Sequence, residues 1–333
     1  MGAIIAVMSD KYPGISVVIP TYNGEKTIGK TIESILNQKY DGELDIIVVN
    51  DCSIDDTLKV VQQYPIKIIN NDTNLGFARS VNKGVKASKN DIVSVIHEDI
   101  LLAENEWFKK LVPYLKDDEV ALVSSPVILS KEIYEKFGFW EKALFSWDLK
   151  EDYENSVEIC TDGYSDLKNV IFKKDTFLKF WGLDGETYRA ACEDVDLSIK
   201  LFKVGYKMVS VPTPVYHLHS SRVAKLSRIL FEYRPRLAEG QGVLFRKYRF
   251  RAWDINNQIF KTLAVIVLFI PSNFIRIFGA LYIATIVFGN AVRAFKVMKD
   301  LKVFMLVPPV KLLDYFLDVF YFWKGFITGR QRK

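Results

Sequence analysis

Short apolar runs alternate with amphipathic segments over the first 220 residues of the chain. The apolar runs are rich in β-branched residues and have the length of buried strands; they are Ile15–Pro20, Leu44–Asn50, Ile66–Ile69 and Ile92–Ile96. Between the first two runs, apolar residues recur at helical spacing, which predicts a helix over about residues 26–38. This order of strands and helices predicts an α/β fold built on a doubly wound parallel sheet.

Capping signals and weaker apolar runs predict the elements that complete this region. Ser53 and Asp56 have the spacing of a capping box, which predicts a helix that runs to about Tyr64. A second helix is expected to begin at Glu193. Further elements are a helix over Trp107–Leu115 and strands at Val120–Val127, Val170–Phe172 and Lys207–Val211. Residues 130–165 are aromatic-rich and follow no clear period, so we treat them as an insertion that faces the substrate.

The last third of the chain is more apolar than the rest. Thr262–Ile275 and Ile277–Val292 are apolar runs separated by Arg276. Each reaches the length of a membrane span, about 17 to 20 residues, only if a charge near one end is included. We expect a membrane-bound tail, either a short hairpin through the bilayer or helices in its surface. The alternative is a soluble helical domain or a dimer interface.

A third apolar segment, Val303–Ile327, carries charges along one side. Lys311, Asp314 and Asp318 share one helical face, which predicts an amphipathic helix lying in the plane of the membrane. The chain has a net charge of +5, and its basic residues cluster at Arg222–Arg251, Arg293–Lys302 and Arg330–Lys333. Basic clusters beside apolar helices favour anionic lipid head groups over nucleic acid.

Cysteine usage and the N-terminus carry little chemistry. The 3 cysteines, Cys52, Cys160 and Cys192, have the spacing of neither a disulfide framework nor a zinc site, which favours reduced thiols on the cytosolic side. The apolar patch Ala3–Met8 is too short for a signal sequence or a membrane span.

The candidate chemistry begins directly after the strand Ile92–Ile96, with His97, Glu98 and Asp99. Ligands of open α/β sheets bind beyond the carboxyl ends of the strands, and carboxylates there can hold Mg²⁺ or Mn²⁺. No GxGxxG or GxxxxGK[ST] follows any strand, so a metal at Asp99 would take the place of such a phosphate loop. The alternative is a solvated acidic turn.

A second acidic cluster opens the helix that begins at Glu193. Acids in a first helical turn stabilise a helix by a few tenths up to about 1 kcal/mol, which is the purely structural interpretation. Asp196 lies about 200° around the helix from Asp194, so we interpret it as structural and paired with Lys200 at i+4.

Five motifs in this order resemble family 2 glycosyltransferases, which have a GT-A fold with a doubly wound mixed sheet. The resemblance covers about residues 14–221. The motifs are Val18-Ile19-Pro20-Thr21-Tyr22-Asn23, Val48-Val49-Asn50-Asp51-Cys52-Ser53, Asn74-Leu75-Gly76-Phe77-Ala78, His97-Glu98-Asp99 and Glu193-Asp194-Val195-Asp196-Leu197. The third is similar to a run in the rhamnosyltransferase-like branch. His97 departs from the family, because it replaces the first aspartate of the usual Asp-x-Asp.

The resemblance implies transfer of a sugar from a nucleotide-diphosphate donor with inversion at the anomeric carbon. It assigns the catalytic base to Asp194 and an acceptor or sugar contact to Glu193. Mg²⁺ or Mn²⁺ is expected on Asp99 and His217, with His97 and His219 as further candidate ligands. The residues implied for the donor nucleotide are Pro20, Thr21, Tyr22, Asn23, Asp51 and Glu98.

These expectations divide the chain into four parts: an extension (1–13), a GT-A catalytic domain (14–221), a basic helical linker (222–255) and a membrane-associated helical tail (256–333). The tail predicts a lipid-linked or cell-surface glycan acceptor at the cytoplasmic face of the cell membrane. A processive polysaccharide synthase is disfavoured, because no Gln-x-x-Arg-Trp follows the acidic cluster. The alternatives are a polyprenyl-phosphate sugar synthase and a non-catalytic nucleotide-sugar binding protein.

Overall fold

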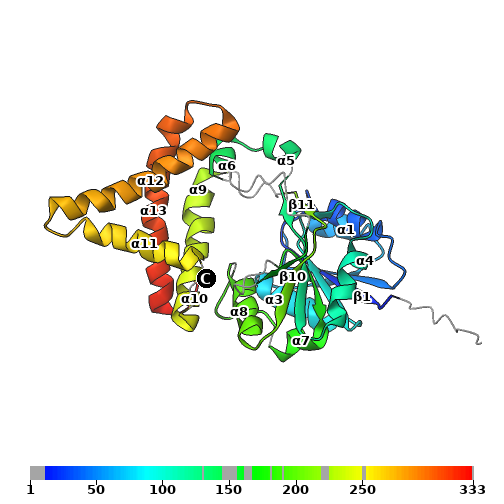
Figure 1. The fold of residues 1–333 in the computed structure, drawn as a ribbon. Helices are drawn as coiled ribbons and strands as arrows, with labels where there is room; N and C mark the ends of the chain where they lie inside the picture. Colours follow the sequence, from blue (N-terminus) through cyan, green and yellow to red (C-terminus); the bar gives the residue numbers. More distant parts are fainter. Residues whose placement is uncertain are drawn as a thin grey trace, which may run out of the picture.

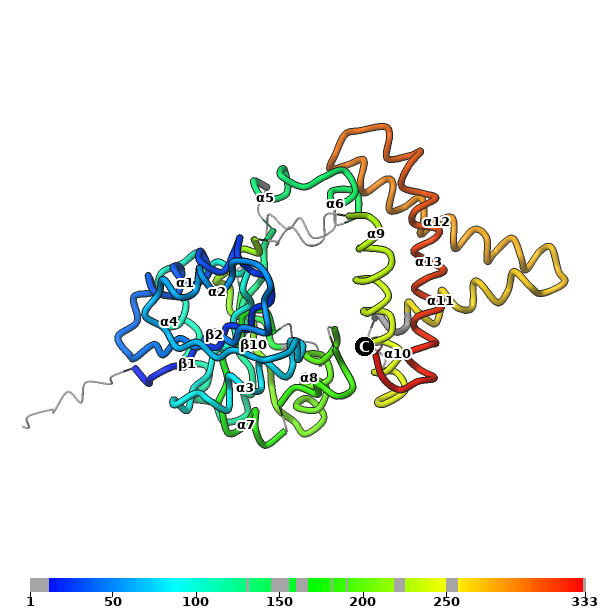
Figure 2. Tube along the Cα trace, turned by 180° about the vertical axis from the view of Figure 1, so that it is seen from behind, coloured from blue at the N-terminus to red at the C-terminus, as the bar shows by residue number. Residues whose placement is uncertain are grey.

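The chain folds into an α/β part and a helical part that stand side by side, as two opposite views show (Figures 1 and 2). The structure is a computed structural model. It describes residues 12–129, 131–144, 156–160, 167–180, 182–189, 191–218, 225–249 and 253–331.

A mixed sheet of 8 strands forms the centre of the α/β part, in the order β3-β2-β1-β4-β9-β6-β10-β8. The strands are β1 (Ile15–Thr21), β2 (Leu44–Asn50), β3 (Lys67–Asn70), β4 (Ile92–Ile96), β6 (Val120–Ser124), β8 (Glu158–Cys160), β9 (Asn169–Lys173) and β10 (Lys207–Ser210). The first four in sheet order are parallel, whereas β9 runs antiparallel to both β4 and β6. The prediction of a doubly wound mixed sheet is confirmed, and the purely parallel order holds only as far as β4.

Helices cover both faces of this sheet. Side chains of β1 alternate between the two faces, with Val17 in one apolar layer and Val18 in the other. The first layer also holds α1 (Ile28–Leu36), α2 (Thr57–Val61) and α4 (Trp107–Leu111), which continues as a 3₁₀ turn. The second holds α3 (Phe77–Ala87), α7 (Lys174–Lys179) and α8 (Glu193–Lys203).

The chain forms a small second sheet from segments that follow β4, β6 and β10. It consists of β5 (Ile100–Leu102), β11 (Val215–His217) and β7 (Val127–Ile128). β11 pairs antiparallel with β5, which sets His217 opposite Ile100. Residues far apart in the sequence therefore meet directly after β4.

The predicted capping box at Ser53 and Asp56 is wrong. Helix α2 begins only at Thr57, and the side chain of its N-cap residue, Asp56, makes no capping hydrogen bond. The Ser53 hydroxyl accepts a hydrogen bond from the Asn23 backbone N–H at 2.9 Å. A tertiary donor thus occupies the oxygen that the local pattern assigns to a helix cap.

Over residues 225–249 and 253–331, the structure describes a short α9 (Leu226–Arg228), a π-helical turn and four longer helices. These are α10 (Arg234–Tyr248), α11 (Trp253–Val267), α12 (Asn273–Met298) and α13 (Val303–Thr328). α10 and α13 lie against each other, and the α11–α12 hairpin points away from the α/β part (Figures 1 and 2). Arg276 separates the two apolar runs in the sequence, but the chain leaves the helix around Pro271, and Arg276 lies in the first turn of α12.

Within the insertion at 130–165, the structure describes α5 (Lys131–Glu135), α6 (Phe139–Leu144) and β8. Phe139 and Ala143 of α6 pack against Ala291 and Ala294 of α12. The insertion therefore joins the α/β part to the helical part.

The charged face of α13 points into the bundle. Lys311, Asp314 and Asp318 share one face, as the spacing predicts, but all three are buried. Asp314 pairs with Arg234 of α10 at 3.1 Å, and Asp318 pairs with Lys261 of α11 at 2.9 Å. The expectation of an in-plane helix with a water-facing polar side does not describe this arrangement, because neighbouring helices cover that side.

We expect the Lys261–Asp318 pair to control the stability of the bundle. Both side chains are about one-tenth exposed, at 11% and 9%. Asp318→Ala leaves a buried, uncompensated ammonium and should lower the free energy of unfolding by about 3 to 5 kcal/mol. The measurement is chemical denaturation in detergent. The double variant Lys261→Met/Asp318→Leu removes both charges and should cost far less, and equal losses in the two proteins would contradict this account.

Candidate active site

The loop after β1 is held by a carboxylate from the end of β4. The Thr21 hydroxyl donates a short hydrogen bond to Glu98 Oε2, and the Tyr22 backbone N–H donates to the same oxygen at 2.9 Å. A Cβ at Gly24 would lie 2.5 Å from that oxygen, so any other residue there would displace the Glu98 carboxylate. The strand residue Pro20 is buried beneath this loop. Glu98 therefore shapes the loop that the motifs assign to the donor nucleotide.

The loop after β2 joins the same group. Asn23 lies in the left-handed region, at φ 55°, and its side-chain carbonyl accepts a hydrogen bond from the Ile54 N–H at 2.8 Å. With the bond from the Asn23 N–H to Ser53, this ties the β1 and β2 loops together. The loops that follow β1, β2 and β4 thus meet at one edge of the sheet.

Asp51 is buried and orders the turn that leads into α3. Its two carboxylate oxygens accept hydrogen bonds from the backbone N–H groups of Leu75 and Gly76, each at 2.8 Å. The Asn71 side chain donates to Oδ1 at 2.8 Å as well. Asn71 is a site residue that sequence reasoning missed. A contact between Asp51 and a nucleotide base stays a prediction.

Asp99 and His217 come together from the two ends of the α/β part. His217 Nε2 lies 3.2 Å from Asp99 Oδ2, and the two side chains are 17% and 15% exposed. The pairing of β11 with β5 brings them together, and the Leu218 N–H also donates to the Asp99 carbonyl at 2.7 Å. His217, which the sequence favours over His219 as a metal ligand, therefore contacts Asp99, the carboxylate that follows β4.

Of the other two histidines, the structure describes only His97. The His97 ring packs against Phe77 at the start of α3, with ring centroids 4.7 Å apart. His219 lies outside the described residues.

The donor set at Asp99 and His217 fits a small divalent cation that also binds substrate oxygens. Neighbouring ligands of an octahedral ion with bonds of about 2.1 Å lie about 3 Å apart, close to the 3.2 Å separation of these two atoms. Among the residues that the structure describes, no group of 3 or more His, Cys, Asp or Glu could hold a metal. A cation that bridges phosphates is usually bound by one or two carboxylates together with substrate oxygens.

The acidic cluster lies at the start of α8. Cys192, directly before the helix, lies in the left-handed region at φ 71°. Asp194 is half-buried, and its Oδ1 accepts a hydrogen bond from the Val195 N–H at 2.8 Å. Glu193 is buried. The predicted base, Asp194, and the predicted acceptor or sugar contact, Glu193, thus lie in the first turn of one helix.

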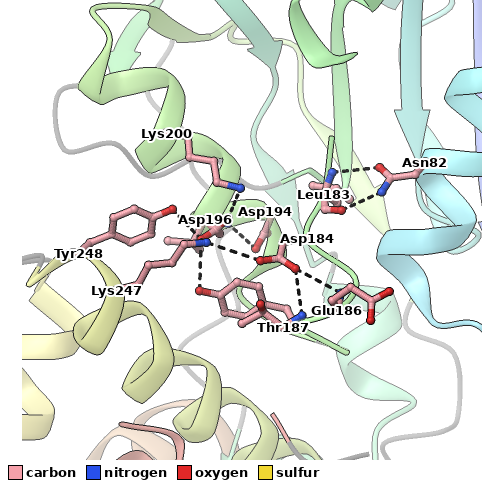
Figure 3. Close-up of polar contacts among 12 residues, drawn as sticks. Asn82, Leu183, Asp184, Glu186, Thr187, Asp194, Asp196, Lys200, Lys247 and Tyr248 are labelled. Carbon is pink, nitrogen blue, oxygen red and sulfur yellow. Dashed lines mark hydrogen bonds and ion pairs between the residues drawn. The ribbon is translucent and has the colours of Figure 1, made fainter. Parts of the chain in front are cut away.

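Asp196 has a structural role, as its spacing predicts. It is fully buried and pairs with Lys200 at 2.6 Å. It also accepts hydrogen bonds from Lys247 and Tyr248 of α10, each at 2.7 Å (Figure 3). Burial, followed by the hydrogen bond to Asp196, raises the pKa of the Tyr248 hydroxyl, so this group stays a donor.

The segment before α8 lines a cavity of about 340 Å³. Its walls are α3, α8 and the segment itself; the lining residues are Arg79, Asn82, Gly182, Leu183, Asp184, Gly185, Glu186 and Lys200. Asn82 fixes this wall by exchanging two hydrogen bonds with the Leu183 backbone, at 2.7 and 3.0 Å (Figure 3). Burial alone raises the pKa of Asp184, but hydrogen bonds from Thr187 and the charge of Lys247 hold it below its usual range.

Comparison with known proteins agrees with this geometry. The Glycosyl transferase family 2 sequence model matches residues 16–162. An uncharacterized glycosyltransferase of Haemophilus influenzae is 32% identical over 205 residues, which are 54% of this chain and 62% of that protein. A poly-beta-1,6-N-acetyl-D-glucosamine synthase of Staphylococcus epidermidis is 26% identical over 209 residues, 60% of this chain and 48% of that protein. The chain thus spans less than two thirds of these relatives.

Solved structures share the fold. The mannosyltransferase PcManGT from Pyrobaculum calidifontis, in complex with GDP-Man and Mn²⁺, has a TM-score of 0.57 at 17% identity and covers 95% of this chain and 87% of its own. S. aureus TarS 1–349, in complex with UDP, has a TM-score of 0.50 at 18% identity and covers 89% and 90%. Residues 16–162 are thus similar to Glycosyl transferase family 2, and the likeness to solved structures shows that the chain has a GT-A fold.

Proposed function

We propose that the chain is an inverting glycosyltransferase that moves one sugar from a nucleotide-diphosphate sugar to a hydroxyl of a lipid-linked or cell-surface glycan. The observation that carries this is the edge of the sheet where Glu98 holds the β1 loop and Asp99 meets His217. Ligands of α/β sheets bind at that edge. The bound GDP-Man of PcManGT and UDP of TarS support a nucleotide donor.

In this proposal Asp99 and His217 would hold a Mg²⁺ or Mn²⁺ ion beside the donor diphosphate. When bound, such an ion offsets the charge that grows on the leaving diphosphate. Thr21, Tyr22 and Glu98 set the shape of the nucleotide loop. The Mn²⁺ in PcManGT supports a divalent cation.

Asp194 is the proposed base. Its half-buried carboxylate at the start of α8 is held by the Val195 N–H, and it would take the proton from the acceptor hydroxyl during attack. Glu193, buried beside it, is the proposed acceptor contact. Attack on the face opposite the leaving group inverts the anomeric carbon.

The helical tail is proposed to bind the cytoplasmic face of the cell membrane. Its charges pair inside the bundle, whereas large apolar side chains are exposed outside, among them Phe260, Phe269, Phe274, Phe278, Phe288, Phe320 and Ile327. In the described chain, 1 helix, α12, is long and apolar enough to cross a membrane, with a mean hydropathy of 1.7 over its most apolar 18 residues. An exposed apolar surface of this kind is unfavourable in water, and lipid acyl chains would cover it.

Asp194→Asn tests the base. The amide cannot accept the proton, so kcat should fall about 10²- to 10⁴-fold while donor affinity changes little. The assay measures transfer with a panel of UDP-, GDP- and dTDP-sugars, membrane extract supplying the acceptor, and the anomeric configuration of the product. Asp175→Asn, an exposed acid in the first turn of α7, is the matched control. A fully active Asp194→Asn protein, or a product that keeps the anomeric configuration of the donor, would contradict this mechanism. A wild type that binds nucleotide sugar without transferring it would favour a non-catalytic nucleotide-sugar binding protein.

Asp99→Asn tests the cation. Mn²⁺ should raise the affinity of the wild type for the donor nucleotide at least about tenfold, and the variant should lose this gain because it lacks an anionic ligand. Calorimetric titration of nucleotide with Mn²⁺ or with chelator measures the effect without turnover. If the wild type binds the nucleotide with the same affinity in Mn²⁺ and in chelator, the proposed cation site is excluded.

Phe274→Ser/Phe278→Ser tests the membrane surface. These side chains are 71% and 59% exposed on α12, so their loss should reduce flotation with vesicles of mixed neutral and anionic lipid. Leu36→Ser, at an exposed apolar position of α1, is the control and should float like the wild type. If the wild type does not float with the vesicles, the tail has another partner.

An acceptor assay separates the two enzyme hypotheses. A polyprenyl-phosphate sugar synthase should use bare polyprenyl phosphate, whereas a glycan transferase should use lipid-linked sugar.

A further inference from the structure

We propose that the helical part positions the catalytic base, through Lys247 on one side of Asp194 and Gln331 on the other. The inference deepens the proposed function and rests on it, because it assigns positioning residues to the same transfer reaction. Both residues lie far from Asp194 in the sequence, and both contact the short stretch of chain that carries it.

Lys247 acts behind the base, on the buried carboxylate of Asp196. Its ammonium lies 2.7 Å from Asp196 Oδ1 and 3.6 Å from Asp184 Oδ2, so it bridges α8 to the segment before it (Figure 3). A buried carboxylate is stable only when its oxygens are paired. Since Lys200 belongs to α8 itself, Lys247 is the cation that ties this carboxylate to another helix.

Gln331 acts ahead of the base, on the backbone that leads into α8. Its side-chain carbonyl accepts from the Arg189 N–H at 2.7 Å, and its amide donates to the Ala191 carbonyl at 2.9 Å. The same amide donates to the Arg236 carbonyl of α10 at 2.9 Å, and the Gln331 N–H donates to the Thr187 carbonyl at 3.1 Å. The side chain is buried, at 6% exposed. One glutamine thus fixes three residues just before Glu193 and anchors them to α10.

The anchoring helix is itself rigidly placed. A Cβ at Gly242 of α10 would lie 1.9 Å from the Phe322 carbonyl oxygen, and one at Gly325 of α13 would lie 2.1 Å from the Glu239 carbonyl oxygen. The two backbones are therefore in direct contact. A Cβ at Gly240 would lie 2.7 Å from Cys192 Sγ, so α10 also touches the residue at which α8 begins. Movement of the bundle would carry the first turn of α8 with it.

This arrangement has a kinetic consequence that plain stabilisation lacks. The base must stay within hydrogen-bond reach of the acceptor hydroxyl, and a displacement of about 1 Å can cost 10²-fold in rate. The nucleotide loops are held separately, by Glu98 and Asp51. Loss of Lys247 or Gln331 should therefore lower kcat and leave donor binding intact.

The experiment compares the full-length wild type with Lys247→Met and Gln331→Ala. Each variant should lower kcat about tenfold or more with the donor KM within about twofold, and each should speed amide hydrogen exchange over residues 187–195 but not over 77–87. Lys247→Arg keeps the charge and should retain more of kcat than Lys247→Met. Lys86→Met, at an exposed position of α3, makes the same side-chain change away from the site and should match the wild type.

Wild-type kcat in the folded variants, or a rise in donor KM that matches the fall in kcat, would overturn the positioning role. If Lys247→Met does not fold, Gln331→Ala decides the question, because it buries no unpaired charge. If the wild type transfers sugar and the variants keep its kcat, the positioning role is refuted while the proposed function stands. A wild type without transfer to any acceptor would refute the proposed function, and the inference with it.

Discussion

One buried carboxylate, that of Asp196, links the two parts of the molecule. Asp196 is removed from water and satisfied by Lys200 from its own helix and by Lys247 and Tyr248 from α10. Desolvating a carboxylate is costly, so the contacts that α10 makes to Asp196 stabilise the folded state. The GT-A part and the helical part are therefore linked by a buried ion pair as well as by apolar contact.

The sequence predicts most of the large sheet, because its strands are β-branched runs that no other element explains. It does not predict β5, β7 and β11, since strands of 2 or 3 residues leave no period to detect. The capping error at Ser53 has a different cause. Its hydroxyl can serve either the helix or Asn23, and only the tertiary structure decides which.

The site residues also divide into those that the sequence predicts and those that only the structure reveals. Motif spacing identifies Glu98 and Asp99, and the structure sets both where three loops meet. Asn71 and Gln331 carry no signal, because a side-chain amide whose hydrogen-bond partner lies 20 to 140 residues away along the chain has no local pattern. For α13, periodicity gives the shared face of Lys311, Asp314 and Asp318. It does not say whether water or other helices cover that face.

The contact of Gln331 with the Ala191 carbonyl spans 140 residues of chain. During synthesis on the ribosome, the whole α/β part emerges before this glutamine does, and N-terminal units fold first. The segment ahead of α8 thus gains its last hydrogen bonds only after the final helix has docked. Under the positioning proposal, a nascent chain would hold its donor nucleotide early and become competent for transfer late, once its apolar helices have found their place.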